Sequence, residues 1–306
     1  MSTAFLFPGQ GSQYVGMGGA WYRASHEART LYEQADARLG YPLSAKCLDG
    51  PAADLNRTEY TQPAIFLTSL AMWAAAQATL PAPVYVAGHS LGEFAALVVA
   101  GVLTFDAALQ VVAERGQLMA RAGEHAPGGM AVLLGASVEV ASALCAAATE
   151  SAGEPLVVAN DNCPGQVVIS GASAALEAAA EQSRALGIRR FRRLPISVAP
   201  HSPLMARSQA EFAELLQTIA IHPPQIPVVM NATAAPVETP EAIREALLKQ
   251  LTSPVRWRES LLWMHARGVE HFIEIGPKNV LTGLVQRAVG KDVVAEALDD
   301  RSPEVA

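Results

Sequence analysis

The stretch VAGHSLGEFAALVVAG, residues 86–101, joins strand-forming residues to an apolar helix through a turn that contains glycine at positions 88 and 92. Gly88-His89-Ser90-Leu91-Gly92 matches the pattern G-x-S-x-G, and a strand before it and a helix after it are the context in which this pattern forms a nucleophile elbow. A side chain at either glycine would crowd such a turn. The pattern therefore favours a reactive Ser90 at the carboxyl end of a strand, with a purely structural turn as the alternative.

Strand and helix patterns alternate on both sides of this turn. Residues 3–7 and 84–87 are typical of buried strands, and helical patterns occupy residues 62–78, 91–100 and 104–122. This order indicates a mostly parallel sheet that is covered by helices.

The order of elements changes from Pro127 onward. Strands are predicted at 130–135, 156–160, 166–170 and 188–195, with helices at 138–150 and 174–186. The order β-α-β-β-α-β is the ferredoxin-like one. Strands at 226–231 and 269–276 and a closing helix from Val280 then resume the first pattern, and a loose end follows Leu298. We therefore expect an α/β protein with a large domain, residues 1–126 and 196–306, and an inserted small domain, residues 127–195.

Composition and charge argue against several classes of protein. The 306 residues are 51% hydrophobic and 17% charged, a balance typical of a globular enzyme. A formal charge of −7 argues against nucleic-acid binding, which needs a basic face. The longest apolar stretch, residues 94–105, is too short to span a bilayer, and residues 1–12 do not resemble a signal peptide. Cys47, Cys145 and Cys163 fit neither a disulfide framework nor a zinc site, so we expect a cytoplasmic protein.

The glycine-rich segment FPGQGSQYVGMGG, residues 7–19, does not fit a phosphate-binding loop. A dinucleotide fingerprint that starts at Gly9 would need glycine where Tyr14 stands, and a P-loop that starts at Gly11 would need lysine where Met17 stands. A strand-to-helix turn is the remaining local interpretation.

A reactive serine needs a base, and the chain offers His26, His89, His125, His201, His222, His265 and His271. His89 adjoins Ser90 on the turn, so its side chain is expected to point elsewhere. His26, His265 and His271 lie in or beside helical patterns, where surface or packing roles are expected. His201 follows Pro200 in SVAPHSPLM, between a strand and a helix, where a side chain can project into a cleft. We therefore favour His201.

Two arginine features stand out. Arg115 lies on the second helix after the turn, and its spacing alone favours a solvated side chain that pairs with Glu114 or other helical neighbours. Near a nucleophile, its guanidinium would instead hold a carboxylate by two parallel hydrogen bonds. A cluster of Arg189, Arg190, Arg192 and Arg193 crosses the last strand of the small domain, and strand alternation places these side chains on both faces. On an acidic protein this cluster is a candidate surface for a phosphate or an acidic partner.

Seven segments together resemble the malonyl-CoA:acyl-carrier-protein transacylase family in their order and approximate spacing. They are FPGQGSQ (7–13), GHSLGEFAALVVAG (88–101), ERGQLM (114–119), NDNCPGQVVISG (160–171), SVAPHSPLM (197–205), QLTSPVRW (250–257) and EIGPKNVLTGL (274–284). The resemblance runs from Thr3 to about Val289. It implies a hydrolase-like large domain, an inserted ferredoxin-like small domain, and an active site in the cleft between them.

The resemblance also implies roles for individual residues. Ser90 would be the acylated nucleophile, His201 its base, and the backbone carbonyl of Gln250 would orient the imidazole. Gln10 and the Leu91 N–H would form the oxyanion hole.

Two further side chains take roles in the same way. Arg115 would bind the free carboxylate of a malonyl group, and Asn160 would support the cleft. The reaction implied is transfer of malonyl from coenzyme A to the phosphopantetheine thiol of an acyl carrier protein, in fatty-acid or polyketide biosynthesis. It needs no bound cofactor or metal. We expect a monomer that contacts the carrier protein transiently and binds neither nucleic acid nor membrane.

Alternatives remain open on the sequence. Many malonyl-selective relatives carry phenylalanine where Pro200 stands, so another carboxylated group such as methylmalonyl is an alternative substrate. A serine acyl-thioester hydrolase would use Ser90, Asp161 and His201 in that order. A non-catalytic subunit that docks the carrier protein is the third alternative, although it predicts loss of Ser90 or His201, and both are present.

Overall fold

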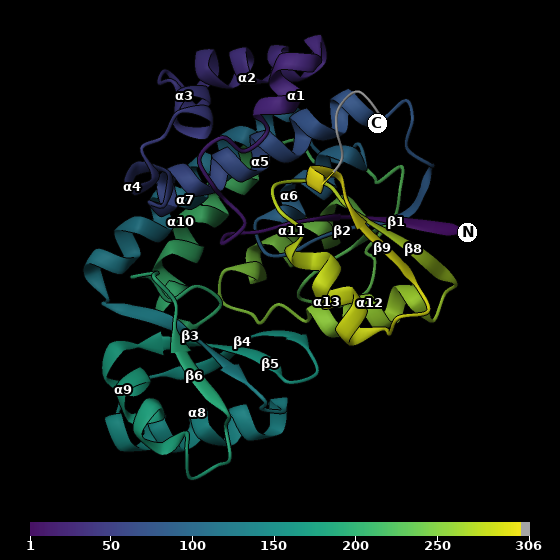
Figure 1. The fold of residues 1–306 in the computed structure, drawn as a ribbon. Coiled ribbons are helices and arrows are strands. Elements are labelled where there is room, and N and C mark those ends of the chain that lie inside the picture. The colour runs from purple at the N-terminus through teal and green to yellow at the C-terminus, as the bar shows by residue number, and fades with distance from the viewer. Residues whose placement is uncertain (301–306) are drawn as a thin grey trace.

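Strand β1 (Ser2–Phe7) lies at the centre of a five-stranded sheet, sheet A, in the computed structural model, which describes residues 1–300 (Figure 1). The strand order is β7-β2-β1-β8-β9, and every neighbouring pair is parallel. The other strands are β2 (Pro83–Gly88), β7 (Val228–Val229), β8 (Val269–Glu274) and β9 (Val294–Ala297). Because parallel strands end at one edge of a sheet, the segments that follow β1 and β2 are brought together there.

Helices cover both faces of sheet A. Successive residues of β1 point to opposite faces, so Phe5 and Phe7 enter one hydrophobic core while Ala4 and Leu6 enter another. The first core is closed by α1 (Gly19–Ala24), α2 (His26–Leu39), α3 (Leu43–Leu48), α4 (Ala52–Leu55), α5 (Thr58–Ala76), α6 (Gly92–Val99), α7 (Phe105–His125), α10 (Ala206–Thr218) and α11 (Pro240–Gln250). The second is closed by α12 (Trp257–His265) and α13 (Val280–Ala288). The predicted parallel sheet covered by helices is confirmed.

A second sheet, sheet B, is antiparallel and lies at the bottom of Figure 1. Its strands are β3 (Gly128–Leu134), β4 (Leu156–Cys163), β5 (Gln166–Ala172) and β6 (Arg190–Arg193), in the order β4-β5-β3-β6. Helices α8 (Val138–Ala152) and α9 (Ser173–Gln182) connect them. The chain order β-α-β-β-α-β is the ferredoxin-like order that the sequence predicted.

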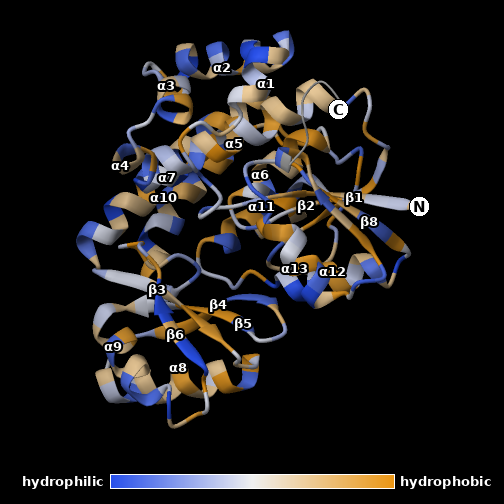
Figure 2. Cartoon of the chain, viewed as in Figure 1, coloured by the Kyte–Doolittle hydropathy of each residue, from blue (hydrophilic) through white to orange (hydrophobic). Residues whose placement is uncertain are grey.

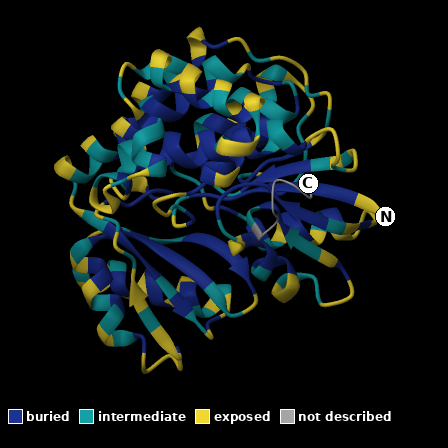
Figure 3. Ribbon diagram, turned by 45° about the horizontal axis from the view of Figure 1, so that its top comes forward, coloured by how far each residue is buried: buried dark blue, intermediate teal, exposed yellow. Residues whose placement is uncertain are grey.

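The two faces of sheet B have different neighbours. One face packs on α8 and α9, which begin at Val138 and Ser173. The other face carries a small apolar cluster of Met130, Ala159 and Val168, with Val132, Leu194 and Ile196 packed against it. Strands of this sheet are largely apolar in Figure 2, whereas β6 is hydrophilic, and Figure 3 shows it exposed. The second face is therefore free to cover a cleft above sheet A.

A short backbone contact fastens sheet B to the rest of the chain. Val255 forms an isolated parallel bridge with Asn160 of β4. The Val255 N–H donates to the Ala159 carbonyl at 2.8 Å, and the Asp161 N–H donates to the Val255 carbonyl at 3.1 Å. Arg258 of α12 adds an ion pair to Asp161 at 2.8 Å. These contacts fix sheet B over the carboxyl edge of sheet A.

Several predicted bounds were wrong. The strand predicted at 226–231 is only Val228–Val229, because the next N–H groups bond elsewhere: that of Met230 donates to Ala235 and that of Asn231 to a side chain of α6. The strand predicted at 188–195 shortens to β6. Helices α3 and α4, and strand β9, were missed.

The chain after Leu298 is not uniformly loose. Residues 298–300 form a short 3-10 helix, and Asp299 accepts hydrogen bonds from the Tyr14 hydroxyl and the Lys278 N–H. The rest of the predicted loose end, residues 301–306, lies outside the described residues. Within residues 1–300, no helix is long and apolar enough to cross a membrane.

Candidate active site

Ser90 lies at the sharp turn between β2 and α6. Its φ is 51°, in the left-handed region that non-glycine residues rarely adopt. Two hydrogen bonds hold the turn: the His89 N–H donates to the Phe7 carbonyl at 2.9 Å, and the Ser90 N–H donates to Asn231 Oδ1 at 2.7 Å. The strained backbone is therefore fixed from β1 and from the segment after β7, which raises the serine hydroxyl above the sheet edge.

The glycines of the turn are required by close approach. A Cβ at Gly92 would overlap the carbonyl of Phe7, and a Cβ at Gly9 would overlap the carbonyl of His89. Gly9 therefore lets the loop after β1 lie directly against the elbow. This loop carries Gln10, whose side chain donates to Thr58 Oγ1 at 3.3 Å and which lines the same cavity as Ser90.

Lys278 holds the same loop from outside. Its φ is 64°, and its Nζ donates to the carbonyls of Gly11 at 3.2 Å and Gln13 at 3.1 Å. Its N–H donates to Asp299. Lys278 thus connects the Gln10 loop to the segments around α13 and β9.

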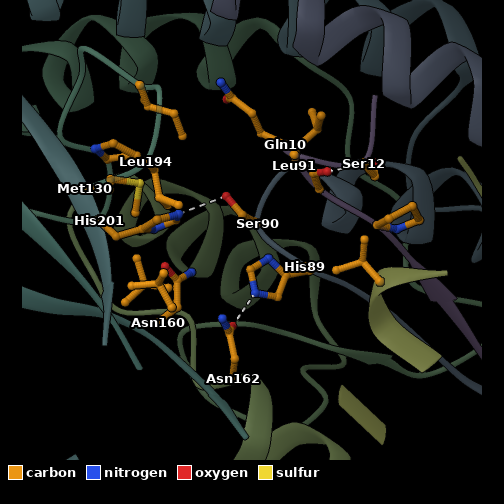
Figure 4. A pocket seen from close by; sticks show the side chains of 18 of the residues that line it. Gln10, Ser12, His89, Ser90, Leu91, Met130, Asn160, Asn162, Leu194 and His201 are labelled. Carbon is orange, nitrogen blue, oxygen red and sulfur yellow. Dashed lines mark hydrogen bonds between the residues drawn. The ribbon is translucent and has the colours of Figure 1, made fainter. Parts of the chain in front are cut away.

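His201 contacts Ser90 directly. Its Nε2 lies 2.8 Å from Ser90 Oγ, while its Nδ1 lies 2.8 Å from the carbonyl of Gln250 and 3.1 Å from that of Ser253. Carbonyls only accept hydrogen bonds, so Nδ1 carries the proton and Nε2 offers its lone pair to the serine hydroxyl. Figure 4 shows Ser90 and His201 pointing toward each other.

The surroundings of His201 keep its ring neutral. The side chain is 2% exposed, and its backbone φ is 59°. Burial, and then the positive charge of Arg115, lower the pKa of His201 to about 3, while the hydrogen bonds to the carbonyls of Gln250 and Ser253 act to raise it. At neutral pH the imidazole is therefore able to accept a proton.

Arg115 is buried, and the solvated side chain favoured by spacing alone was wrong. It is 1% exposed, because α7 packs this face against α5 and the elbow. Its Nε donates to Gln250 Oε1 at 3.2 Å, its Nη1 to Gln62 Oε1 at 2.7 Å, and its Nη2 to Ser90 Oγ at 3.2 Å. Burial lowers its pKa to about 10, so the guanidinium stays charged at neutral pH. A fixed positive charge therefore adjoins the serine.

Residues of sheet B and of the segments that follow β1 and β2 line one cavity of about 270 Å³ around Ser90. The elbow and the Gln10 loop form one side, and the apolar cluster of sheet B forms the other, with Leu194 and Met130 labelled in Figure 4. Pro200 and Asn160 also line it. Within the part of the chain that the structure describes, no group of three or more His, Cys, Asp or Glu side chains could hold a metal ion.

His89 points away from the serine, as expected. Its Nε2 lies 2.8 Å from Asn162 Oδ1 (Figure 4). Its ring packs edge-on against Trp257 at 5.3 Å between centroids. Because Asn162 belongs to β4, this contact links the elbow to sheet B. Burial lowers the pKa of His89, so this ring too is neutral.

Other sequence candidates lie outside this constellation. The triad of Ser90, Asp161 and His201 is not formed, since Asp161 pairs with Arg258 and His201 turns its Nδ1 to backbone carbonyls. Strand register places Arg192 beside Val132, on the face of sheet B that covers the cleft, and Arg193 beside Ala131, on the helix face. The remaining residues of the cluster, Arg189 and Arg190, are exposed.

Sequence reasoning missed four polar residues beside the site: Gln62, Glu93, Asn162 and Asn231. Three of them carried a signal. Gln62 and Glu93 are polar side chains in apolar helical segments, and Asn231 lies two residues after the buried strand β7. Such isolated polar residues are buried only where hydrogen bonds satisfy them.

The model of the family described as "Acyl transferase domain" matches residues 4–301. The chain belongs to this acyl transferase family.

Relatives within the acyl transferase family are similar over nearly the whole chain. Malonyl CoA-acyl carrier protein transacylase of Escherichia coli (strain K12) is 42% identical over 306 residues, which cover 99% of this chain and 97% of the relative. The crystal structure of an acyl carrier protein S-malonyltransferase from Vibrio cholerae O1 biovar eltor has a TM-score of 0.94 and 41% identity, covering 100% of this chain and 99% of that one.

A third acyl transferase relative was solved with a partner. It is described as a malonyl-transacylase in complex with its type II PKS acyl-carrier protein, and it has a TM-score of 0.95 at 38% identity, covering 100% of this chain and 98% of that one. Together these similarities confirm the predicted family and the predicted α/β architecture.

Proposed function

We propose that this acyl transferase moves a malonyl group from malonyl-CoA to the phosphopantetheine thiol of an acyl carrier protein through a malonyl ester of Ser90. The names of its relatives support the substrate and the partner. The observation that carries the proposal is the charged guanidinium of Arg115, which is buried and lies 3.2 Å from Ser90 Oγ. A buried cation at that distance fits an acyl group that ends in a carboxylate.

In the first half-reaction, His201 removes the Ser90 proton through Nε2, and the serine oxygen attacks the thioester carbonyl of malonyl-CoA. The negative charge of the tetrahedral intermediate falls on the former carbonyl oxygen. The N–H groups of Leu91 and residue 10 stabilise this oxygen, and one such donor is typically worth about 3 kcal/mol. The intermediate collapses, the C–S bond breaks, and His201 returns the proton to the departing coenzyme A thiolate.

In the second half-reaction, the nucleophile is the phosphopantetheine thiol of the carrier protein. His201 takes the thiol proton, the sulfur attacks the malonyl ester, and the proton is passed to Ser90 Oγ as the C–O bond breaks. Arg115 holds the malonyl carboxylate throughout and so keeps the carbonyl against the oxyanion donors. The apolar face of sheet B limits the water that can reach the ester.

The test is a competition for Ser90 among malonyl-, methylmalonyl- and acetyl-CoA, read by intact mass of the protein. We expect malonyl to be the main adduct. Because Pro200 lines the cavity, the methylmalonyl share measures how strictly the α-branch is excluded. Absence of any adduct on Ser90 would reject the proposal and favour a subunit that only docks the carrier protein.

Arg115→Ala is the diagnostic variant. It should sharply reduce malonyl loading and shift the adducts toward acetyl, because an acetyl group has no carboxylate that could pair with the guanidinium. Arg121→Ala is the matched control, since Arg121 lies on the same helix but pairs with Glu114 and Glu211 at the surface. Unchanged discrimination in Arg115→Ala would remove this residue from the substrate site.

Hydrolysis is distinguished by the fate of the malonyl group. With carrier protein present, the proposal predicts that malonyl-carrier forms faster than free malonate. Predominant release of malonate would establish a hydrolase instead.

A further inference from the structure

Glu93 is a carboxylate buried beneath the active site without a role in the proposed chemistry. It is 1% exposed and stands in the first turn of α6, whose other residues, Gly92 and Phe94–Val99, are apolar or glycine. Burying a carboxylate is costly unless hydrogen bonds and opposite charge compensate. Its position in the helix supplies part of that compensation, because N–H groups at a helix N-terminus favour negative charge.

Both oxygens of Glu93 accept short hydrogen bonds from the polar residues that surround the elbow. Oε1 accepts from the Asn231 N–H at 2.6 Å, and Oε2 accepts from Gln250 Nε2 at 2.6 Å. Both partners are donors, so this position requires a group that only accepts. Glu93 in its ionised form meets that requirement.

Asn231 connects Glu93 to Ser90. Its Oδ1 accepts from the Ser90 N–H at 2.7 Å, and its Nδ2 donates to the Gly88 carbonyl at 2.6 Å. The amide thus bonds on both sides of the elbow, and Glu93 holds the backbone from which it projects. The strained φ of Ser90 is fixed through this residue.

Gln250 connects Glu93 to Arg115 and His201. Its Nε2 also donates to the Ser90 carbonyl at 2.9 Å, and its Oε1 accepts from Arg115 Nε at 3.2 Å. Its backbone carbonyl accepts from His201 Nδ1 at 2.8 Å. Because Glu93 and the Ser90 carbonyl both take hydrogens from Nε2, the amide can point only its oxygen at Arg115.

We propose that Glu93 is a positioning residue that orients Asn231 and Gln250 and thereby aligns Ser90, His201 and Arg115 for acyl transfer. For the alignment of Arg115 with a substrate carboxylate, the inference rests on the proposed function. For the alignment of Ser90 and His201 it does not.

Charge supports the same role. Arg115 is fully buried, and the negative charge of Glu93 favours its charged form. Burial raises the pKa of Glu93 to about 7, while its bonds to Asn231 and Gln250 and the charge of Arg115 act to lower it. The hydrogen bonds of the network and the charge of Arg115 therefore favour the ionised form of Glu93 against the effect of burial.

Glu93→Gln separates this role from simple packing, since the two side chains have nearly the same shape. A glutamine amide can accept from one neighbour, but its NH2 group then faces the second donor. If Gln250 rotates its amide to relieve that clash, its own NH2 group faces Arg115 Nε. Either arrangement misplaces the groups around Ser90.

The experiment measures the reactivity of Ser90 in the full-length protein by two readouts. One is the rate at which a fluorophosphonate probe labels Ser90, which reports the serine and histidine without any acyl substrate. The other is the ratio of malonyl to acetyl loading from the CoA thioesters. Glu114→Gln is the matched control, because Glu114 precedes Arg115 on α7 but pairs with Arg121 at the surface. Circular dichroism and Tm give the folded fraction of each variant.

We expect Glu93→Gln to slow labelling per folded molecule by about 10- to 100-fold, the loss expected for one charge-assisted hydrogen bond, and to lower the malonyl to acetyl ratio. Glu114→Gln should match the wild type in both. Labelling within twofold of the wild type in folded Glu93→Gln would overturn the proposal, because a purely structural residue lowers Tm without changing the rate.

Two other results of this experiment would also decide the role of Glu93. If Glu93→Gln does not fold, Glu93→Asp decides: it keeps the buried charge but is one methylene too short to reach both donors, so slow labelling supports the proposal and wild-type labelling overturns it. If the wild type accepts no malonyl, the proposed function fails, while the labelling rates still decide the role of Glu93 at Ser90.

Discussion

Replacing His201 by asparagine should make the protein more resistant to acid. His201 is buried as a neutral ring, so acidification favours the unfolded chain, in which the imidazole is free to take up a proton. Asparagine cannot titrate, its amide can donate to the Gln250 carbonyl as Nδ1 does, and it tolerates the φ of 59° at this position. The substitution therefore removes the titration while keeping the local backbone.

The size of the effect follows from the two pKa values. The pKa of His201 is lowered from its ordinary value of 6.5 to about 3. The stability linked to this group is complete above pH 6.5 and is lost as pH falls toward 3. Between pH 7 and pH 5 the wild type should lose about 2 kcal/mol of unfolding free energy through His201. Glu93, whose pKa is raised, acts in the opposite direction, but it is present in both proteins and cancels in the comparison.

Urea unfolding at pH 7, 6 and 5 measures the unfolding free energy of both proteins. The comparison requires that this free energy fall with urea concentration at the same slope in both. The fall in unfolding free energy from pH 7 to pH 5 should be about 2 kcal/mol smaller in His201→Asn than in the wild type. Parallel losses, differing by less than about 0.5 kcal/mol, would show that His201 is not held neutral by burial. The reasoning on its role as a base would then fail.

Three more substitutions test other parts of the structure. Gly92→Ala should destabilise the protein by more than about 3 kcal/mol in urea unfolding, because the new Cβ overlaps the carbonyl at the end of β1; a stable, active variant would contradict the close approach. Lys278→Gly should leave the unfolding free energy within about 1 kcal/mol, since glycine relieves the positive φ, yet slow Ser90 labelling about fivefold by loosening the Gln10 loop. Equal labelling rates would show that the loop is held without the lysine. Arg192→Glu should raise KM for carrier protein more than KM for malonyl-CoA, with Arg193→Glu on the opposite face as control; equal effects of the two would indicate no carrier contact there.

Local pattern was sufficient for the central parts of the fold. The elbow at Ser90 could be predicted because its glycines, strand and helix are neighbours in the chain, and β1 and the ferredoxin-like order follow from short apolar runs. Local context already favoured His201 among the seven histidines, and the family resemblance made it the base. The role of Arg115 came from the resemblance alone, since spacing favoured a solvated arginine. Their burial depends on helix packing that no local pattern contains.

The rest could not be predicted because it depends on contacts between distant segments. Glu93 meets Gln250 and Asn231 only after α6, α11 and the end of β7 come together. The same meeting shortens β7, because the Asn231 N–H bonds to Glu93 instead of to a neighbouring strand. β9 was missed because its few residues, Val294–Ala297, gain stability only from pairing with β8.

The left-handed backbone at Ser90 has a consequence for any attempt to engineer this protein. Glycine adopts such an angle without strain and removes only one hydroxyl group here, so exchanging Ser90 for glycine should raise thermal stability while abolishing catalysis. A screen that rewards heat resistance alone would therefore enrich inactive variants at this position. Directed evolution of this chain needs turnover as a second criterion from the first round, because here the residues that strain the fold are the ones that carry the reaction.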